Sequence, residues 1–563
     1  MASRLERKWM NKRIPSSYTF EIQNNKIRAK IFEPDSRKFD ELIGYVRAFK
    51  GAYYDSMSRQ WIIPNSEQNI MLLQNVGFNE LKRSSRQKKV VKRVKCDIWM
   101  DYELTNPIPE YLRPYQVDGL RFLSWRGDRG GIIGDECGVG KTLQSIGYVD
   151  YMKYERVLFV VTSATKLQWA SVIKKFIPWL DFQVLEGKTI KPITHKSVIV
   201  NWDILCDQSG IITDIGRFKP RGGLSECKFD LIIGDEIQYI GGHSSARTKA
   251  FRWLCKHTTT RAPIGMSGTP IKTCPAQFYD ILALVMPSVF NNHMKFLLRY
   301  CDPKSNGFQM VYKGISNADE LYNLVQPAMI RRHKLEVLTD MPPKDIEVVP
   351  IEPKNHNSYL KAEKEAFAPV SATRSRIDIN NAIDALDQTI YEQKRAGAVE
   401  WIKEKLDNDP TKKLFIGVWH KPVGRSLIDD LSAYNPVLIN GDVTGKQRED
   451  AKRKFIEDSE CRVCVGNILA SGVGIDGFQK VCSHVVTVEF APSPCDHEQF
   501  EDRAWRSGQT EPVLCSYLVC KDTIDMDKMA TLDERKKVIG GLIDGKDESE
   551  IDFYSDLLKK RGI

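Results

Sequence analysis

The sequence lacks any apolar run long enough to cross a membrane. None of its 563 residues lies in a stretch approaching the roughly 20 apolar residues that a membrane helix requires. The first residues, MASRLERKWMNKR, have no apolar segment of the kind that a secretory signal needs. Low-complexity tracts and short-period repeats are absent as well. We therefore expect a protein that stays inside a cell and has no membrane partner.

A paired cysteine framework is also missing. The 13 cysteines are odd in number and scattered, which is typical of reduced thiols in a cytosolic or nuclear compartment. Cys461 and Cys464 form one C-x-x-C, but no second pair follows at zinc-finger spacing. Both lie in the strand-like run CRVCVG, so we interpret them as core residues and predict no structural metal.

Acidic residues are scarce only at the front of the chain. The net charge is +10; residues 1–95 hold 21 Lys and Arg against nine Asp and Glu, and the remainder holds 62 against 64. The densest basic run is LKRSSRQKKVVKRVK (81–95). It can track a phosphate backbone, act as a nuclear address or serve as a solvated linker. Its candidates for DNA binding are Lys88, Lys89, Lys92 and Arg93.

Short apolar runs rich in β-branched residues predict two sets of buried parallel strands. The first set is GGIIGD, VLFVVTS, SVIVNW, FDLIIGDE and IGMSGTP, and the second is LFIGVW, PVLING, CRVCVGN, HVVTVEF and CSYLVC. Helical stretches alternate with them, which predicts an α/β fold of two similar lobes. Residues 275–335 and 351–408 have helical spacing and high charge, and we expect helical insertions there.

The stretch GDECGVGKT (134–142) ends as a phosphate-binding loop ends, although the usual pattern places glycine where Asp135 stands. Backbone N–H groups from Gly138 to Lys141 can wrap a nucleotide's phosphates, and Lys141 can reach the β and γ oxygens. Thr142 can hold Mg²⁺. Asp135 and Glu136 then lie at the end of the strand rather than against the phosphates.

Two further motifs complete a nucleotide-hydrolysing site. After the strand LIIG, Asp235 can hold the Mg²⁺ and Glu236 can orient and deprotonate the attacking water. In QFEDRAWRSGQT (499–510), Arg503 and Arg506 are three residues apart, which predicts one helical face. If the second lobe closes on the first, these guanidinium groups can reach the transferring phosphoryl group.

Seven ordered motifs together resemble those of the Swi/Snf-like superfamily 2 ATPases, which are DNA-stimulated motors. They are YLRPYQVDGLRFL (111–123), DECGVGKT (135–142), KLQW (166–169), DEIQ (235–238), SGTP (267–270), SGVGIDG (471–477) and QFEDRAWRSGQT. The resemblance covers about residues 105–535 and accounts for the acids of the loop, because this family's loop typically begins Asp-Glu. It implies two RecA-like lobes with helical insertions, ATP as the substrate and Mg²⁺ as the cofactor.

The resemblance also implies individual roles. Gln116 corresponds to the glutamine that reads adenine, with Arg113 beside it. Gly138, Gly140, Lys141 and Thr142 correspond to the phosphate and Mg²⁺ contacts, and Asp235 and Glu236 to the hydrolytic acids. Gly474 belongs to the nucleotide face of the second lobe, and Gln499, Arg503 and Arg506 are the closing contacts. Lys166 and Thr269 are DNA-binding candidates.

Residues 317–344 are similar to the annealing-helicase, fork-remodelling subgroup, and residues 49–73 resemble its small HARP module. There Lys50, Tyr53 and Arg59 are DNA-binding candidates, with Tyr54 and Trp61 nearby. These aromatic residues can stack on branched or single-stranded DNA or fill the core of a small α+β domain. For Trp61 and Phe49 we favour the core.

These observations predict five segments. They are a HARP-like domain (1–80), a basic linker (81–104), a first ATPase lobe (105–340), a second lobe (341–545) and a C-terminal helix (546–563).

The sequence departs from the family pattern at three places. Gln238 stands where histidine is usual, which puts in doubt the coupling of hydrolysis to DNA movement. Ser163 and Ala164 replace a turn that contains proline, and Trp505 replaces a frequent histidine.

Three functions are consistent with the sequence. The first is a monomeric, sequence-independent translocase on duplex DNA that remodels or re-anneals forked DNA. The second is a translocase that displaces a bound protein such as polymerase or a nucleosome, and the third is an ATP-gated DNA clamp that does not move. The expected location is the cytoplasm of a bacterium or of a virus-infected cell, or the nucleus.

Overall fold

The structure is a computed structural model. It describes residues 17–23, 26–32, 42–44, 46–55, 60–75, 78–80, 96–214, 217–220, 222–271, 274–305, 310–312, 314–373, 376–443, 445–472, 475–530 and 532. The chain divides into two compact units, Met1–Lys92 and Arg93–Ile563. No helix within the described residues is long and apolar enough to span a bilayer. The predicted C-terminal helix (546–563) and most of the basic linker lie outside the described residues.

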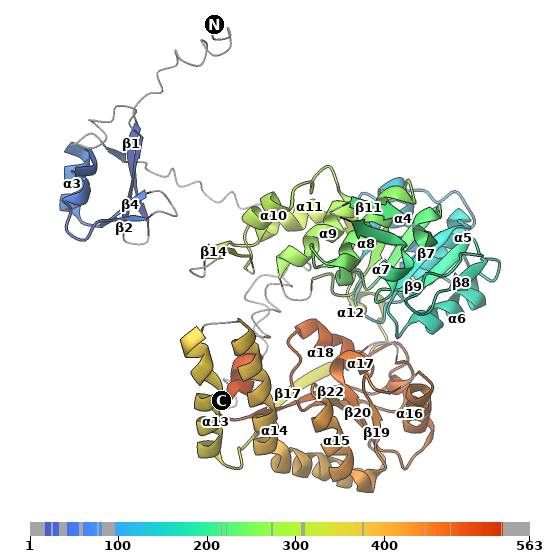
Figure 1. Cartoon of the computed structure of the whole chain (residues 1–563). Coiled ribbons are helices and arrows are strands. Elements are labelled where there is room, and N and C mark those ends of the chain that lie inside the picture. The colour runs from blue at the N-terminus through green and yellow to red at the C-terminus, as the bar shows by residue number, and fades with distance from the viewer. Residues whose placement is uncertain are drawn as a thin grey trace. The chain divides into compact units, whose positions relative to one another are not determined.

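The N-terminal unit is a small α+β domain built on a five-stranded sheet (Figure 1). Its strand order is β3-β4-β2-β1-β5, with β1 Ser17–Gln23, β2 Lys26–Phe32, β3 Tyr53–Asp55, β4 Gln60–Pro64 and β5 Asn79–Glu80. Helix α3 (Glu67–Asn75) contributes Leu73 to the core. Trp61 is buried in that core, as expected, whereas Tyr53 and Tyr54 are half exposed on the edge strand.

Lobe 1 is a seven-stranded sheet in which every pair of neighbouring strands is parallel. The order is β16-β6-β13-β12-β7-β9-β8, with β6 Gly131–Ile133, β7 Val157–Val161, β8 Phe182–Val184, β9 Ser197–Asn201, β12 Leu231–Asp235, β13 Ile264–Met266 and β16 Met329–Ile330. All five side chains of β7 are buried, because helices cover both faces of a parallel sheet. The five strands predicted for the first series are confirmed.

Helices and one hairpin surround this sheet. Helix α4 Pro114–Arg126 precedes the first strand of the sheet. The helices between the strands are α5 Lys141–Met152, α6 Lys166–Phe176, α7 Leu205–Gln208 and α8 Ala246–His257, and the hairpin is β10 Ile211–Asp214 with β11 Arg217–Pro220. The predicted helical insertion contains α9 Tyr279–Val285, α10 His293–Tyr300, α11 Ala318–Val325 and α12 Lys334–Val337, with a second hairpin, β14 Lys304–Ser305 and β15 Met310–Val311.

Lobe 2 repeats the plan with six strands (Figure 1). Its order is β17-β22-β21-β18-β20-β19, with β17 Lys344–Ile351, β18 Leu414–Val418, β19 Val437–Ile439, β20 Val463–Asn467, β21 His484–Thr487 and β22 Val513–Cys520. The helices are α13 His356–Thr373, α14 Arg376–Asp407, α15 Lys421–Asp430, α16 Gly445–Glu457, α17 Ile468–Ser471 and α18 Pro494–Glu501. Cys461 and Cys464 are buried core thiols, as expected. The predicted α/β class with two RecA-like lobes is confirmed.

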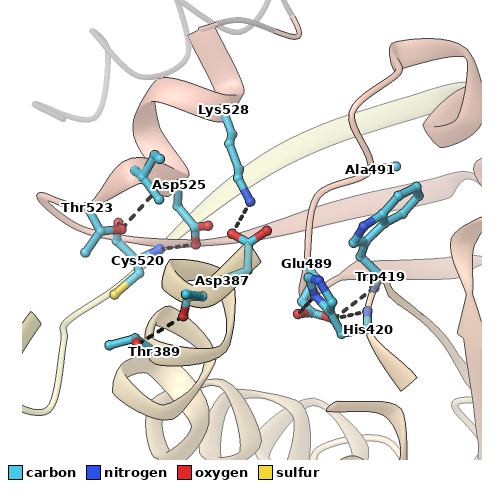
Figure 2. A network of polar contacts seen from close by, with 12 residues as sticks. Asp387, Thr389, Trp419, His420, Glu489, Ala491, Cys520, Thr523, Asp525 and Lys528 are labelled. Atoms are coloured by element: carbon cyan, nitrogen blue, oxygen red, sulfur yellow. Dashed lines mark hydrogen bonds and ion pairs between the residues drawn. The ribbon is translucent and has the colours of Figure 1, made fainter. Parts of the chain in front are cut away.

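A polar network fixes the helical insertion of lobe 2 to its sheet (Figure 2). Asp387 of α14 accepts a hydrogen bond from Lys528, and the Asp525 carboxylate accepts one from the backbone N–H of Cys520 at 3.1 Å. Lys394 of α14 is 1% exposed and donates to the same Asp525 oxygen at 2.7 Å. A buried charge left without its partner is costly, so these pairs set the position of α14 on lobe 2.

Candidate active site

The phosphate loop (residues 134–140) joins β6 to α5. Gly138 and Gly140 have φ of +87° and +88°, a conformation that favours glycine. A Cβ at Gly140 would lie 2.3 Å from the Gln116 amide nitrogen, so the loop packs closely on the candidate adenine-reading residue. Lys141 begins α5 and donates to the carbonyls of Asp135 at 2.8 Å and Glu136 at 3.0 Å. The loop thus presents backbone N–H groups at a helix N-terminus, an environment suited to phosphate.

Asp135 anchors the phosphate loop to the segment that leaves lobe 1. The carboxylate is fully buried and accepts hydrogen bonds from Nε of Arg332 at 3.0 Å and from the Gln144 amide at 2.9 Å. The backbone N–H of Arg332 adds a third bond at 3.1 Å. A buried carboxylate requires such a partner, so the Asp135–Arg332 pair holds the loop against residues that follow β16.

Glu136 makes the next contacts along the same segment. Its carboxylate lies 2.8 Å from Nδ1 of His333 and accepts the backbone N–H of Lys334 at 2.7 Å. Burial alone would raise the pKa of Glu136, but these two hydrogen bonds lower it to about 2. The two acids of the loop therefore bind residues 332–334, which lie between the two sheets in the sequence. Sequence reasoning missed this role, and the signal was the basic run RRHK after the strand-like MI.

The acidic pair begins at Asp235, the last residue of β12. Asp235 accepts a hydrogen bond from the Trp169 indole at 2.9 Å, and its backbone carbonyl accepts one from Trp202 at 2.7 Å. Loss of hydration and the neighbouring Glu236 raise the pKa of Asp235 above its ordinary value. Glu236 has φ of +50°, an uncommon conformation for a residue with a side chain and one that recurs at functional sites. The two tryptophans were missed from the sequence, although Trp169 ends the quoted KLQW.

A small cavity of about 110 Å³ lies beside Glu236, lined by residues of both lobes. The amide of Gln238 donates to the Glu236 carboxylate at 2.5 Å. Among the described residues, Oε1 of Gln238 and Nε2 of Gln499 are buried atoms without a hydrogen-bond partner, and both residues line this cavity. Its polar lining and volume suit water molecules, which supply the partners such atoms require.

The prediction that Arg503 and Arg506 share one face of a helix is wrong, because neither residue lies on a helix. Helix α18 ends at Glu501, and the chain continues in tight turns in which the N–H of Arg503 donates to the carbonyl of Phe500. Buried contacts of residues 501 and 502 with lysines outweigh the local helical preference. Both guanidinium groups nonetheless donate to the carbonyl of Ile475, at 3.0 and 3.2 Å. Loss of hydration and the nearby Arg506 lower the pKa of Arg503 to about 10.

The phosphate loop also meets lobe 2. Glu136 and Cys137 of the loop line a cavity of about 320 Å³ together with Asp502 and Trp505. A Cβ built on Gly138 would lie 3.6 Å from Cβ of Arg506. The site therefore brings together the phosphate loop, Glu236 of the acidic pair and the arginine segment (residues 502–506), contributed by two lobes.

The remaining candidate residues are placed as follows. Thr142 is half-buried in the first turn of α5, and Gln116 accepts the N–H of Arg113 at 3.0 Å. Lys166 donates to the Leu185 carbonyl and the Asn201 side chain, and Thr269 is 6% exposed and lines a cavity with Cys137. Lys50 is exposed in the N-terminal unit. The candidates that lie outside the described residues are Gly474, Arg59, Lys88, Lys89, Lys92 and Arg93.

Comparison with known proteins agrees with this arrangement. Residues 115–395 match the model of the SNF2-related domain. This range includes the phosphate loop, the acidic pair and residues 332–334. The chain is a member of the SNF2-related family. It carries that family's helicase-like ATPase core, and the family resemblance drawn from the sequence is confirmed.

Curated relatives match most of the chain. The DNA annealing helicase and endonuclease ZRANB3 of Bos taurus is 28% identical over 490 residues, which cover 82% of this chain and 44% of the relative. The SWI/SNF-related matrix-associated actin-dependent regulator of chromatin subfamily A-like protein 1 of Xenopus tropicalis is 28% identical over 556 residues, 94% of this chain and 57% of the relative. The chain thus spans about half the length of these SNF2-related relatives.

One solved structure is the Sulfolobus solfataricus SWI2/SNF2 ATPase core in complex with dsDNA. It is 21% identical to this chain, with a TM-score of 0.37, and the match covers 81% of this chain and 99% of the other.

Proposed function

We propose that this protein is a DNA-dependent ATPase that moves along duplex DNA and remodels or re-anneals forked DNA. The observation that carries the proposal is the meeting of both lobes at the phosphate loop, with Arg506 beside Gly138 and Glu236 in a cavity shared with Gln499. Nucleotide hydrolysis needs a phosphate loop, an acid and an arginine at one phosphate site. Both lobes of one chain contribute, so a monomer suffices. DNA as a partner implies the nucleus or the cytoplasm of a bacterium or of an infected cell.

The residues present suit ATP and Mg²⁺. The N-terminus of α5 and the two left-handed glycines suit the phosphates, and the Gln116 amide beside Gly140 suits the base. Thr142 and Asp235 offer the hydroxyl and carboxylate oxygens that Mg²⁺ prefers. Bound there, Mg²⁺ neutralises the charge that develops on the phosphoryl oxygens. A nearby cation also favours the ionised form of Asp235, whose pKa is raised.

Hydrolysis requires a water held next to a base. The cavity beside Glu236 supplies the place, and Gln238 orients the carboxylate by its hydrogen bond. Gln238 does not titrate, so it keeps this bond across the pH range in which a histidine would lose or gain a proton. Glu236 accepts the proton of the water, and Arg503 and Arg506 stabilise charge on the transferring phosphoryl group.

A larger cleft of about 830 Å³ offers the path for DNA. Residues of both lobes line it: Thr162, Ser163, Ala164, Leu167, Gln168, Ser171, Val172 and Tyr239 of lobe 1, and Asn440, Gly441, Val443, Arg448, Glu449, Lys452, Leu469, Ala470 and Asp476 of lobe 2. Hydroxyl and amide groups of this kind, with Arg448 and Lys452, suit a phosphate backbone and carry no sequence information. Because both lobes line the cleft, relative motion of the lobes changes the contacts that the cleft makes with DNA.

The N-terminal unit supports a preference for branched DNA. Tyr53 and Tyr54 are 50% and 51% exposed on edge strand β3, and the Lys26 ammonium lies 5.6 Å from the Tyr53 ring. Exposed aromatic rings beside basic side chains can stack on the unpaired bases of a fork. ZRANB3, a relative of this chain, is named a DNA annealing helicase, which agrees with this substrate.

The proposal predicts that ATP hydrolysis is stimulated most by forked DNA, less by blunt duplex and least by single strands. The measurement is steady-state ATPase activity with each DNA, at two salt concentrations. DNA affinity should fall with salt at a log–log slope near −0.9 per neutralised phosphate, because the contacts are with the backbone. The double substitution Tyr53→Ala/Tyr54→Ala should remove the advantage of the fork and leave stimulation by duplex intact.

The matched control is Tyr102→Ala, which removes a tyrosine exposed to 41% on the other unit and should leave the fork preference unchanged. Lys141→Ala should abolish activity with every DNA. If no DNA stimulates the wild type, the DNA-dependent ATPase is wrong. If fork and duplex stimulate equally, the translocase acts on another cargo, such as a DNA-bound protein.

A further inference from the structure

A tryptophan lies between two lysines where the lobes meet. Trp505 of the arginine segment is 8% exposed, and its indole N–H donates to the carbonyl of Pro342 at 2.8 Å. The Lys334 ammonium lies 4.1 Å from the centroid of the ring and the Lys344 ammonium 4.7 Å. Both cations are thus attracted to the electron-rich face of one aromatic ring.

Lys334 connects the phosphate loop to the arginine segment. Its side chain is fully buried, and its ammonium pairs with Asp502 at 2.9 Å and donates to the carbonyl of Trp505 at 2.7 Å. The backbone N–H of Lys334 is held by Glu136 of the loop. The main chain of Lys334 therefore bonds to the phosphate loop of lobe 1, and its ammonium bonds to the arginine segment of lobe 2.

The contact reaches the glycine that shapes the loop. A Cβ built on Gly138 would lie 3.5 Å from Cε of Lys334 and 3.6 Å from Cβ of Arg506. Lys334 and Arg506 therefore lie against the same residue of the phosphate loop. A shift of the Lys334 stem changes the space beside Gly138 in which Arg506 sits.

The charges around the ring are balanced. Burial lowers the pKa of Lys334 and would lower that of Lys344, but Glu501 and Asp502 raise the pKa of Lys344 well above its ordinary value. Lys344 pairs with Glu501 at 3.0 Å. Removing the ring would admit water to these pairs and loosen them, because ion pairs weaken as the local dielectric rises.

We propose that Trp505 and Lys334 are positioning residues that hold Arg503 and Arg506 against the phosphate loop. This inference rests on the proposed ATPase and extends it, because it explains why a tryptophan stands between the two arginines. The residues that bind adenine and phosphate belong to lobe 1 and keep their contacts without the ring. The pair therefore controls the rate of the chemical step more than the affinity for ATP.

The test compares Trp505→Leu, Trp505→Phe and Lys334→Met with the wild-type chain. Trp505→Leu and Lys334→Met should each lower kcat for ATP about 10²-fold, the effect of a misplaced catalytic group, with KM within twofold. The kcat of the double variant should be no lower than that of either single variant, because both substitutions disrupt the same contact between Trp505 and Lys334. Trp505→Phe keeps an aromatic face and should recover most of kcat.

The matched control is Trp179→Leu. Trp179 is a 42% exposed tryptophan with the Lys153 ammonium 5.2 Å from its ring, away from the site. If Trp505→Leu behaves like this control, or if KM rises in parallel with the fall in kcat, the positioning role is wrong.

Hydrogen exchange of the phosphate-loop amides in nucleotide-free protein separates failure of this inference from failure of the proposed function. Trp505→Leu should speed exchange there at least tenfold, and Trp179→Leu should not. If the wild type hydrolyses no ATP, the proposed function fails, and the exchange result still decides whether the ring holds the loop. Unchanged exchange in Trp505→Leu would overturn the inference in either case.

Discussion

Replacing Glu236 with glutamine is expected to slow ATP hydrolysis about 10²- to 10⁴-fold, the usual contribution of a general base. An amide cannot accept the proton of the attacking water, although it fits the same space beside the cavity shared with Gln238 and Gln499. Affinity for ATP should be nearly unchanged, because Glu236 is not among the groups that hold the phosphates. The measurement is kcat together with the equilibrium affinity for ATP.

The control for this substitution is Glu186→Gln, an exposed acid on lobe 1. This substitution should leave both kcat and the affinity for ATP unchanged. If Glu236→Gln retains more than a tenth of the wild-type rate, another group is the base and the assignment is wrong.

Replacing Arg506 with alanine is expected to lower kcat about 10³- to 10⁵-fold, as loss of an arginine that stabilises phosphoryl transfer does. The structure places Arg506 beside Gly138 and gives its guanidinium group a carbonyl partner, Ile475, and a carboxylate partner, Asp476 at 3.2 Å. A phosphoryl group carries more charge than these partners and can displace them. Arg503→Ala should give a loss in the same range.

The matched control is Arg453→Ala, which removes an arginine exposed to 62% and paired within helix α16 to Asp450. Single-turnover kinetics should show that the chemical step, and not ATP binding, accounts for the loss. Equal rates for Arg506→Ala and Arg453→Ala would contradict the role of Arg506.

The sequence predicts ten of the thirteen strands described in the parallel sheets of the two lobes, because most of these ten are short runs of β-branched residues with both faces buried; β8, β16 and β17 were not predicted. Val157–Val161 and Leu414–Val418 are examples in which all five side chains are inside. It also predicts the phosphate loop, because Gly138 and Gly140 must adopt positive φ next to a helix start. These features depend on residues that are close together in the chain.

Features that depend on distant residues were not predicted. Arg332 lies 197 positions from its partner Asp135, so no local pattern connects them. Arg503 and Arg506 have helical spacing, but the buried pairs of Glu501 and Asp502 with lysines end the helix before them. Tertiary contacts override local preference in such cases.

The proposed DNA cleft shows the same limit. Lys166 is basic and lies in the KLQW stretch, yet its ammonium is held by Leu185 and Asn201 inside the lobe. The cleft that both lobes line is instead marked by short polar side chains such as Ser163 and Asn440, which no sequence signal distinguishes from surface residues.

Displacement of a third strand from a duplex tests the central claim most directly, since only movement along the duplex releases that strand. The account predicts that the wild-type chain releases it with ATP and Mg²⁺, and that neither a non-hydrolysable ATP analogue nor the Glu236→Gln protein does so. DNA-stimulated hydrolysis that leaves the third strand in place would contradict it, and would show an ATP-gated clamp instead of a motor.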